Sequence, residues 1–90
     1  MARRISWIKA AVRDFQVFPA AVQEQMTTAL RIAARGEKAD KAKPMKGLGT
    51  GVVEIALAYR GNAYCTVYAV QLGDDVWVIH AFQTKIDPRD

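Results

Sequence analysis

One change in hydrophobic period, near residue 51, constrains the fold of this chain more than any other feature. Upstream of it, apolar side chains recur at helical spacing and form one stripe: Val22, Met26, Ala29, Leu30 and Ala33. Downstream of it, three apolar runs have the composition of strands, and short glycine-containing turns separate them. We therefore expect an α+β domain whose helices pack on one face of a sheet.

Turn and cap residues set the expected boundaries. Pro19 suits the start of the longer helix and Gly36 suits its end. Short connections between the last three strands predict an antiparallel meander, and the nearly continuous apolar run 76–83 predicts a central strand covered on both faces. We expect one domain over residues 1–90. It should begin with a strand at 3–8 and helices at 9–15 and 18–36. A loop at 37–51 should follow, and then three strands at 52–59, 64–72 and 76–83.

The charge balance favours an anionic partner. The chain has 13 Lys and Arg against 9 Asp and Glu, a formal net charge of +4. Six basic and two acidic residues lie in the segment 31–46, although a solvated helix end and loop would explain this segment equally well. A single cysteine cannot form an internal disulfide, and no apolar segment fits a signal peptide or a membrane span, so we expect a cytoplasmic protein without a membrane partner.

The stretch "KPMKGLGTG", residues 43–51, is rich in glycine and lysine, as phosphate-binding loops are. A Walker loop places its lysine after the glycines and opens a helix, so that backbone amides and the helix N-terminus meet the phosphates. Here the lysines precede the glycines and a strand follows, and a dinucleotide-binding fingerprint fails for the same reason. The sequence therefore predicts no nucleotide cofactor, and we expect the glycines to turn the chain into the next strand.

The sequence contains few residues that ligate metals or act as nucleophiles. One histidine and one cysteine, with no ligand spacing among the acidic residues, predict no metal site. Cys65 and His80 fall on adjacent predicted strands, where they could pair as nucleophile and base. Both residues are more often ordinary strand residues, so this pair is the weaker interpretation.

Three segments together resemble one protein family. The segments "KPMKGLGTGVVEI", "AYCTVYAV" and "VWVIHAFQTK" are similar to the phage-derived HigB-like toxins of the RelE/ParE toxin superfamily, and the resemblance runs from residue 5 to residue 85. It implies a RelE-like fold and a toxin that pairs with a cognate antitoxin protein. It further implies a ribosome-dependent mRNA endonuclease that needs no metal, in which the RNA 2′-hydroxyl attacks the adjacent phosphate.

The resemblance also implies roles for individual residues. It assigns catalysis to His80, Tyr64 and Lys85. It assigns contacts with RNA phosphates or bases to Lys43, Lys46, Arg60 and Gln83. For His80 the role is that of an acid, a base or a substrate-orienting group, because histidine is the side chain whose charge changes near neutral pH. The alternatives are a half-buried strand histidine and, for the two lysines, a solvated loop.

The sequence departs from the family pattern at three places. The family's Tyr-Arg-x-x-Tyr motif has Cys65 in the position of the arginine, and Thr84 stands where a lysine is usual. Relatives usually continue past the last strand with a basic segment and a helix, whereas this sequence stops at "IDPRD". An arginine gives a fixed bidentate charge to a phosphate, which a cysteine cannot replace. These departures predict an eroded active site.

Two alternatives to the mRNA endonuclease follow from these departures. One is a catalytically degenerate relative that binds an antitoxin or the ribosome without cleaving RNA. The other is a ParE-like toxin that binds DNA gyrase, although the "KGLG" and "HAF" patterns favour the RNA-cleaving branch. In each case Val17 and Phe18 are candidate anchors for an antitoxin, unless they belong to the core.

Overall fold

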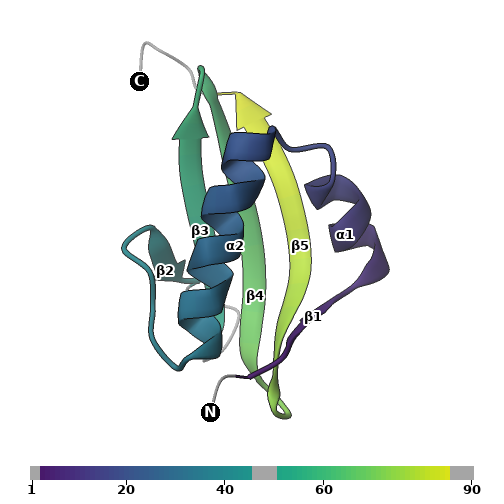
Figure 1. Ribbon diagram of the computed structural model, residues 1–90, viewed down its shortest axis with the longest axis vertical. Helices are drawn as coiled ribbons and strands as arrows, with labels where there is room; N and C mark the ends of the chain where they lie inside the picture. Colours follow the sequence, from purple (N-terminus) through teal and green to yellow (C-terminus); the bar gives the residue numbers. More distant parts are fainter. Residues whose placement is uncertain (1–2, 46–50, 86–90) are drawn as a thin grey trace.

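Five strands form one sheet, and two helices cover one of its faces (Figure 1). The computed structural model describes residues 3–45 and 51–85. The strand order across the sheet is β1-β5-β4-β3-β2; β1 and β5 are parallel and the other pairs are antiparallel. The elements are β1 (Ile5–Trp7), α1 (Lys9–Phe15), α2 (Ala20–Ala34), β2 (Ala42–Pro44), β3 (Val52–Tyr59), β4 (Asn62–Leu72) and β5 (Asp75–Lys85).

The helices form where the apolar spacing predicts them. Pro19 lies at the N-cap of α2, where its missing N–H costs no helical hydrogen bond. Gly36 follows the C-cap with φ of 85°, a conformation that glycine adopts without steric cost. The α2 stripe is fully buried against the sheet and is made by Val22, Met26, Ala29, Leu30 and Ala33. Within the described residues, neither helix is long and apolar enough to cross a membrane.

The three long strands form the predicted antiparallel meander. The predicted 52–59 strand coincides with β3, whereas β4 and β5 extend the predicted ranges at their ends. A two-residue turn joins β3 to β4, with φ of 50° at Arg60 and 83° at Gly61. Two positive φ values indicate a type I′ turn, whose twist matches that of the flanking strands.

Two expectations about the sheet were wrong. The loop expected at 37–51 contains β2, a three-residue edge strand too short to show an alternating pattern. The run 76–83 was expected to be central and covered on both faces, but the central strand is β4. The short strand β1 pairs with only Val76, Trp77 and Val78 of β5, so the rest of β5 lies beyond the reach of β1.

Candidate nucleic-acid interface

The face of the sheet away from the helices, which we call the open face, carries the candidate site. Strand alternation and register place on it Lys43, Val52, Glu54, Ala56, Ala58, Ala63, Cys65, Val67, Ala69, Trp77, His80, Phe82 and Thr84. Three of these residues on β4, Cys65, Val67 and Ala69, are buried although they lie outside the helix-side core cluster. Between Cys65 and Ala69 the central strand is therefore apolar on the open face, and polar groups lie on the strands beside it.

A β-bulge in β5 turns His80 to the open face. Tyr68 pairs with Val78, whereas the preceding residue on β4, Val67, pairs with His80, so Ile79 is an extra residue on β5. Without the bulge, strict alternation along β5 would place His80 on the helix face with Val78. With it, the His80 side chain is exposed, and Ala81 takes the buried position on the helix face. A bulge of this kind re-aims a side chain, and bulges are frequent beside active sites.

One row of paired residues crosses the open face from β2 to β5. Lys43 pairs with Glu54, Glu54 with Val67, and Val67 with His80. Lys43 and His80 are thus separated by three strand spacings, which is about 14 Å. Lys43 is exposed and Glu54 is half-buried. This row places a cation and a proton-transfer group on one surface, with a carboxylate between them.

Aromatic side chains extend the open face along β5. The rings of His80 and Phe82 lie 5.0 Å apart between centroids, at an interplanar angle of 32°. Phe82 and Trp77 are half-buried, so part of each ring is accessible. Aromatic faces beside cationic groups are the elements that bind single-stranded nucleic acid. No sequence pattern assigned Trp77, Phe82 or Glu54 to a site, and only their register with His80 indicates that they lie on the same face.

Cys65 is a buried thiol in the middle of the open face. It pairs with Phe82 on β5 and with Ala56 on β3, and it is 8% exposed. Burial, and secondarily the carboxylate of Glu54, raises the pKa of the Cys65 thiol above its ordinary value of 9.0. Because the thiolate is the reactive form, this environment opposes the Cys65–His80 nucleophile pair considered from the sequence.

Four of the predicted site residues do not meet His80 on the open face. Tyr64 is 5% exposed in the helix-side core, where its ring lies 5.0 Å from that of Phe18. Gln83 and Lys85 follow Ala81 in alternation, which places them on the helix side at the exposed end of β5. The Arg60 guanidinium lies 5.3 Å from the ring centroid of Tyr59, which packs against the helix-side core.

Two further predictions concern Lys46 and metal binding. Lys46 lies outside the described residues. Across residues 3–45 and 51–85, no three His, Cys, Asp or Glu side chains are placed to hold a metal ion.

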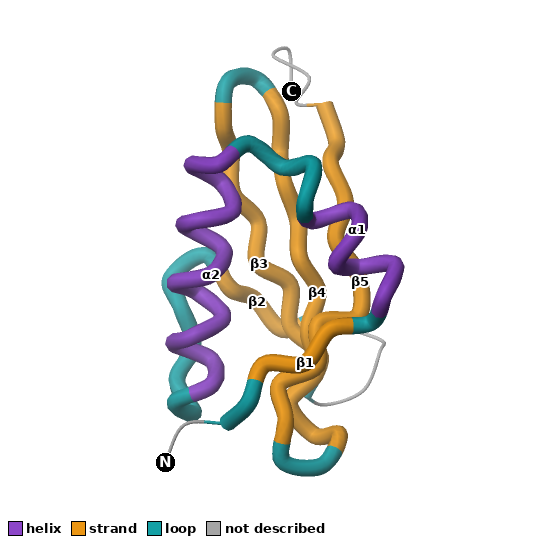
Figure 2. The backbone as a smooth tube through the Cα atoms, turned by 45° about the vertical axis from the view of Figure 1, so that its right-hand side comes forward, coloured by secondary structure: helices purple, strands orange, loops and turns teal. Residues whose placement is uncertain are grey.

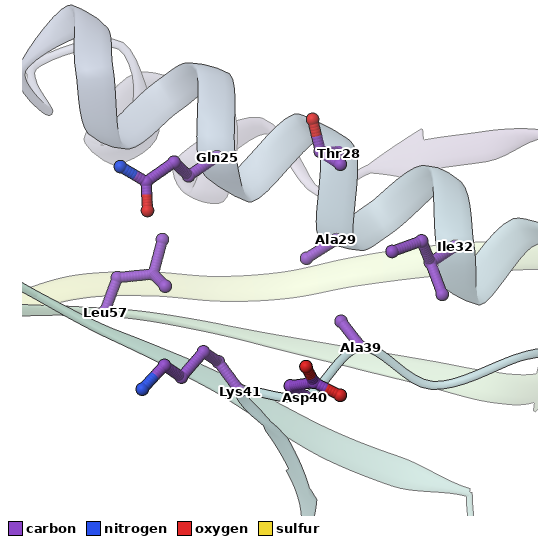
Figure 3. A pocket seen from close by; sticks show the side chains of 8 residues that line it. All are labelled: Gln25, Thr28, Ala29, Ile32, Ala39, Asp40, Lys41 and Leu57. Atoms are coloured by element: carbon purple, nitrogen blue, oxygen red, sulfur yellow. The ribbon is translucent and has the colours of Figure 1, made fainter.

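Two of the hollows beside the helices differ in how they relate to the open face. One lies between α2 and the segment before β2 and is lined mainly by apolar atoms, with Gln25, Asp40 and Lys41 at its rim (Figure 3). The other lies where α1 meets the end of β5; there Val17, which is 81% exposed, borders the same hollow as His80 and Gln83. The first contains no histidine, cysteine or tyrosine, whereas the second touches the open face through His80.

Phe18 and Val17 have different environments, although both were candidate antitoxin anchors. Phe18 is 5% exposed and belongs to the core cluster, so the prediction that it is an exposed anchor was wrong. Val17, one residue earlier, has no such role in the core.

The chain matches the family described as phage-derived protein Gp49-like over residues 13–87. No curated protein sequence matches it significantly. The crystal structure of the isolated E. coli RelE toxin is similar, with a TM-score of 0.77 and 19% identity over 98% of this chain and 90% of that one. A double arginine-to-alanine mutant of E. coli RelE in the free state has a TM-score of 0.73 and 21% identity, over 90% and 82% of the two chains. The RelE-like α+β fold predicted from the sequence is confirmed.

Proposed function

Since this chain belongs to the phage-derived Gp49-like family and has the fold of the RelE toxin, we propose that it is the toxin of a toxin–antitoxin pair. We further propose that its open face binds mRNA in the ribosome and that the reaction there is endonucleolytic cleavage. The observation that carries this proposal is the bulge at Ile79, which places His80 on the same surface as Lys43 and Phe82.

The proposed reaction is an internal transesterification. The 2′-hydroxyl oxygen of one nucleotide attacks the adjacent phosphorus and loses its proton, while the bond from phosphorus to the 5′-oxygen breaks and that oxygen gains a proton. The products are a 2′,3′-cyclic phosphate and a free 5′-hydroxyl. His80 gives or takes one of these protons, since it is an exposed proton-transfer group beside the central strand of this face.

Lys43 and Phe82 position the RNA in this proposal. The exposed ammonium group of Lys43 attracts a backbone phosphate and offsets the negative charge of Glu54, its partner across the strands. The half-buried ring of Phe82, next to His80, offers a surface on which a base can stack. Tyr64 and Lys85 lie away from this surface, so we give them no part in the reaction.

Cys65 favours one competing function, that of a relative that binds without cleaving. Its small, uncharged side chain occupies the position where the family pattern has an arginine, at the centre of the open face. Removing one donor to the charge that develops in a transition state commonly lowers the rate by about 100-fold to 1,000-fold. We therefore propose that the natural sequence binds the ribosome and cleaves RNA slowly. We also propose that an antitoxin regulates this activity.

The antitoxin is proposed to occupy the hollow beside Val17. That side chain is 81% exposed and borders the same hollow as His80 and Gln83. A protein segment seated there would cover His80 directly, and it would thereby block the proposed reaction. The cytoplasm, where mRNA is translated, is the proposed location.

Restoring the missing charges tests whether the site is eroded. Residues 65 and 84 lie diagonally on adjacent strands of the open face, because Cys65 pairs with Phe82 and Thr84 pairs with Ala63. We expect Cys65→Arg with Thr84→Lys to raise RNA cleavage on purified ribosomes by about 100-fold, the factor commonly associated with one such donor. In cells, the same variant should slow growth after induced expression and should produce new mRNA 5′-ends.

Matched controls separate the site from a general charge effect. Gln25→Arg with Thr28→Lys adds the same two charges on the exposed side of α2 and should not raise cleavage. Adding His80→Ala to the restored variant should abolish the gain. A folded Cys65→Arg, Thr84→Lys protein that cleaves no faster than the natural sequence would contradict the nuclease proposal and leave the binding role.

A further inference from the structure

A second basic surface lies at the C-terminal end of α2, on the helix side of the sheet. Three arginines, Arg3, Arg31 and Arg35, line one hollow of about 300 Å³ together with Ile5 and Ala34. We call this the arginine hollow. Arg3 also borders the neighbouring hollow, which Lys38 and the helix-facing side chain of Tyr68 help to line. Figure 2 shows the segment leading into β1 beside the last turn of α2.

Backbone contacts hold the arginines together. The N–H of Arg3 donates a hydrogen bond to the carbonyl oxygen of Ala34 at 2.8 Å. The Arg3 guanidinium donates to the carbonyl oxygen of Val70 at 2.7 Å, which uses one of its five N–H groups. Arg31 and Arg35 are four residues apart at the end of α2, so they lie on one side of the helix, about 6 Å apart along its axis.

The arginine hollow has an excess of positive charge. Within residues 3–45 and 51–85, the one carboxylate within 4.0 Å of these guanidinium groups is Glu37, which meets Arg35 at 4.0 Å. Both side chains of that pair are more than half exposed, so the contact is strongly screened by water. The helix dipole explains why Arg31 and Arg35 suit this end of α2. It does not explain why Arg3, from a different segment, converges on the same hollow.

We propose that the arginine hollow binds backbone phosphates of a folded RNA, as a second contact separate from the open face. Guanidinium groups bind phosphate oxygens through paired N–H donors, and three of them around one hollow form a site for a phosphodiester. The hollow and His80 lie on opposite sides of the sheet, so one short strand of RNA bound at the open face does not fill both. The RNA must present phosphates around the protein, which is a property of a large folded RNA such as that of the ribosome.

This inference rests on the proposed RNA-directed function, and its test separates the two. Arg31→Glu with Arg35→Glu is compared with Lys9→Glu and Arg13→Glu, an equal charge reversal at the same spacing on the exposed side of α1. Binding of each protein to purified bacterial ribosomes and to a 20-nucleotide single-stranded RNA is measured over a series of salt concentrations. Circular dichroism checks that each variant is folded, and Arg31→Gln with Arg35→Gln provides a milder second variant.

We expect the Arg31→Glu, Arg35→Glu protein to bind ribosomes at least tenfold more weakly, with a salt slope smaller by about two. Its affinity for the single-stranded RNA should change no more than that of the α1 control, and the glutamine variant should show a smaller loss in the same direction. Ribosome affinity and salt slope equal to those of the α1 control would overturn the arginine hollow alone. Natural-sequence protein that binds neither ribosomes nor the single-stranded RNA would overturn the RNA-directed function as well.

Discussion

At the scale of single residues, Cys65 leaves the centre of the open face without a charged side chain. Cys65 is buried where an arginine would project into the face, and the side chains beside it on β3, Ala56 and Ala58, are small and exposed. The face therefore retains room for a longer side chain at position 65. This is the physical reason why restoring the arginine is expected to be compatible with the fold.

The thiol of Cys65 should make the protein less stable in alkali. Burial, and secondarily the Glu54 carboxylate, raises the pKa of Cys65 above the 9.0 of a free thiol. The protonated thiol is therefore favoured in the folded state, and this stabilisation is complete below pH 9.0 and is lost as the pH rises toward the folded pKa. Burial likewise raises the pKa of Tyr68 above 10.0, which adds to the loss at higher pH.

Urea unfolding at pH 7 and pH 10.5 measures this effect. The free energy of unfolding should fall between the two pH values, and it should fall less in Cys65→Ala, which has no thiol to ionise. Tyr68 is present in both proteins, so its contribution cancels in the comparison. An identical fall in both proteins would show that the thiol does not contribute.

The sequence identified His80 as a candidate site residue, but it could not predict the environment of its side chain. The family pattern singled out the residue, but strict alternation from Val76 and Val78 would bury it on the helix face. The extra residue at Ile79 reverses the alternation, and a bulge has no signature in an apolar run such as "VWVIHAF". The same bulge moves Gln83 and Lys85 to the helix side, so one local irregularity decides three predicted site residues.

At the scale of the elements, hydrophobic period predicted the long helix and the long strands well. The α2 stripe and β3 were correct because each extends over several repeats of its period. By contrast, β2 is three residues long and contains Pro44, which a sheet accepts at an edge. The parallel pairing of β1 with β5 joins segments that are distant in the sequence, and no local sequence pattern predicts it.

The turn between β3 and β4 gives a prediction about this hairpin. Arg60 has φ of 50°, a conformation that asparagine tolerates better than other non-glycine residues. Arg60→Asn and Arg60→Ala both remove the guanidinium that lies 5.3 Å from the Tyr59 ring. We expect the asparagine variant to be more stable than the alanine variant by about 1 kcal/mol.

Thermal and urea unfolding of the two Arg60 variants provide the measurement. Arg60 lies over Tyr59 rather than on the open face. Neither variant should therefore lower RNA cleavage more than removal of an exposed charge elsewhere on the protein would lower it. A large and specific loss of cleavage in both would return Arg60 to the RNA-binding residues predicted from the sequence.

At the scale of the whole molecule, the first and last strands are joined by one side-chain hydrogen bond as well as by the ladder. The Ser6 hydroxyl donates to a carboxylate oxygen of Asp75, and the two residues are 69 positions apart in the sequence. Hydrogen bonds to charged groups contribute about 1.5–3 kcal/mol to stability. Ser6→Ala should therefore lower the free energy of unfolding by about that amount.

Thr28→Ala is the matched control for Ser6→Ala. Its hydroxyl donates to the carbonyl oxygen of Glu24 within the same exposed stretch of α2, so its loss should cost little. Urea midpoints of the two variants give the comparison. Equal midpoints would mean that the bond between Ser6 and Asp75 contributes no more than an exposed local contact.

The pairing of β1 with β5 also fixes the order in which this protein can assemble. Closing a loop of about 69 residues costs roughly 4 kcal/mol of chain entropy, which must be met before the contacts between the two strands form. Contacts so distant in sequence are typical of domains that fold in milliseconds to seconds. His80 lies on β5, so a nascent chain carries no assembled open face until β5 has been synthesised. In a proposed toxin, this order delays activity until the antitoxin has the finished surface to bind.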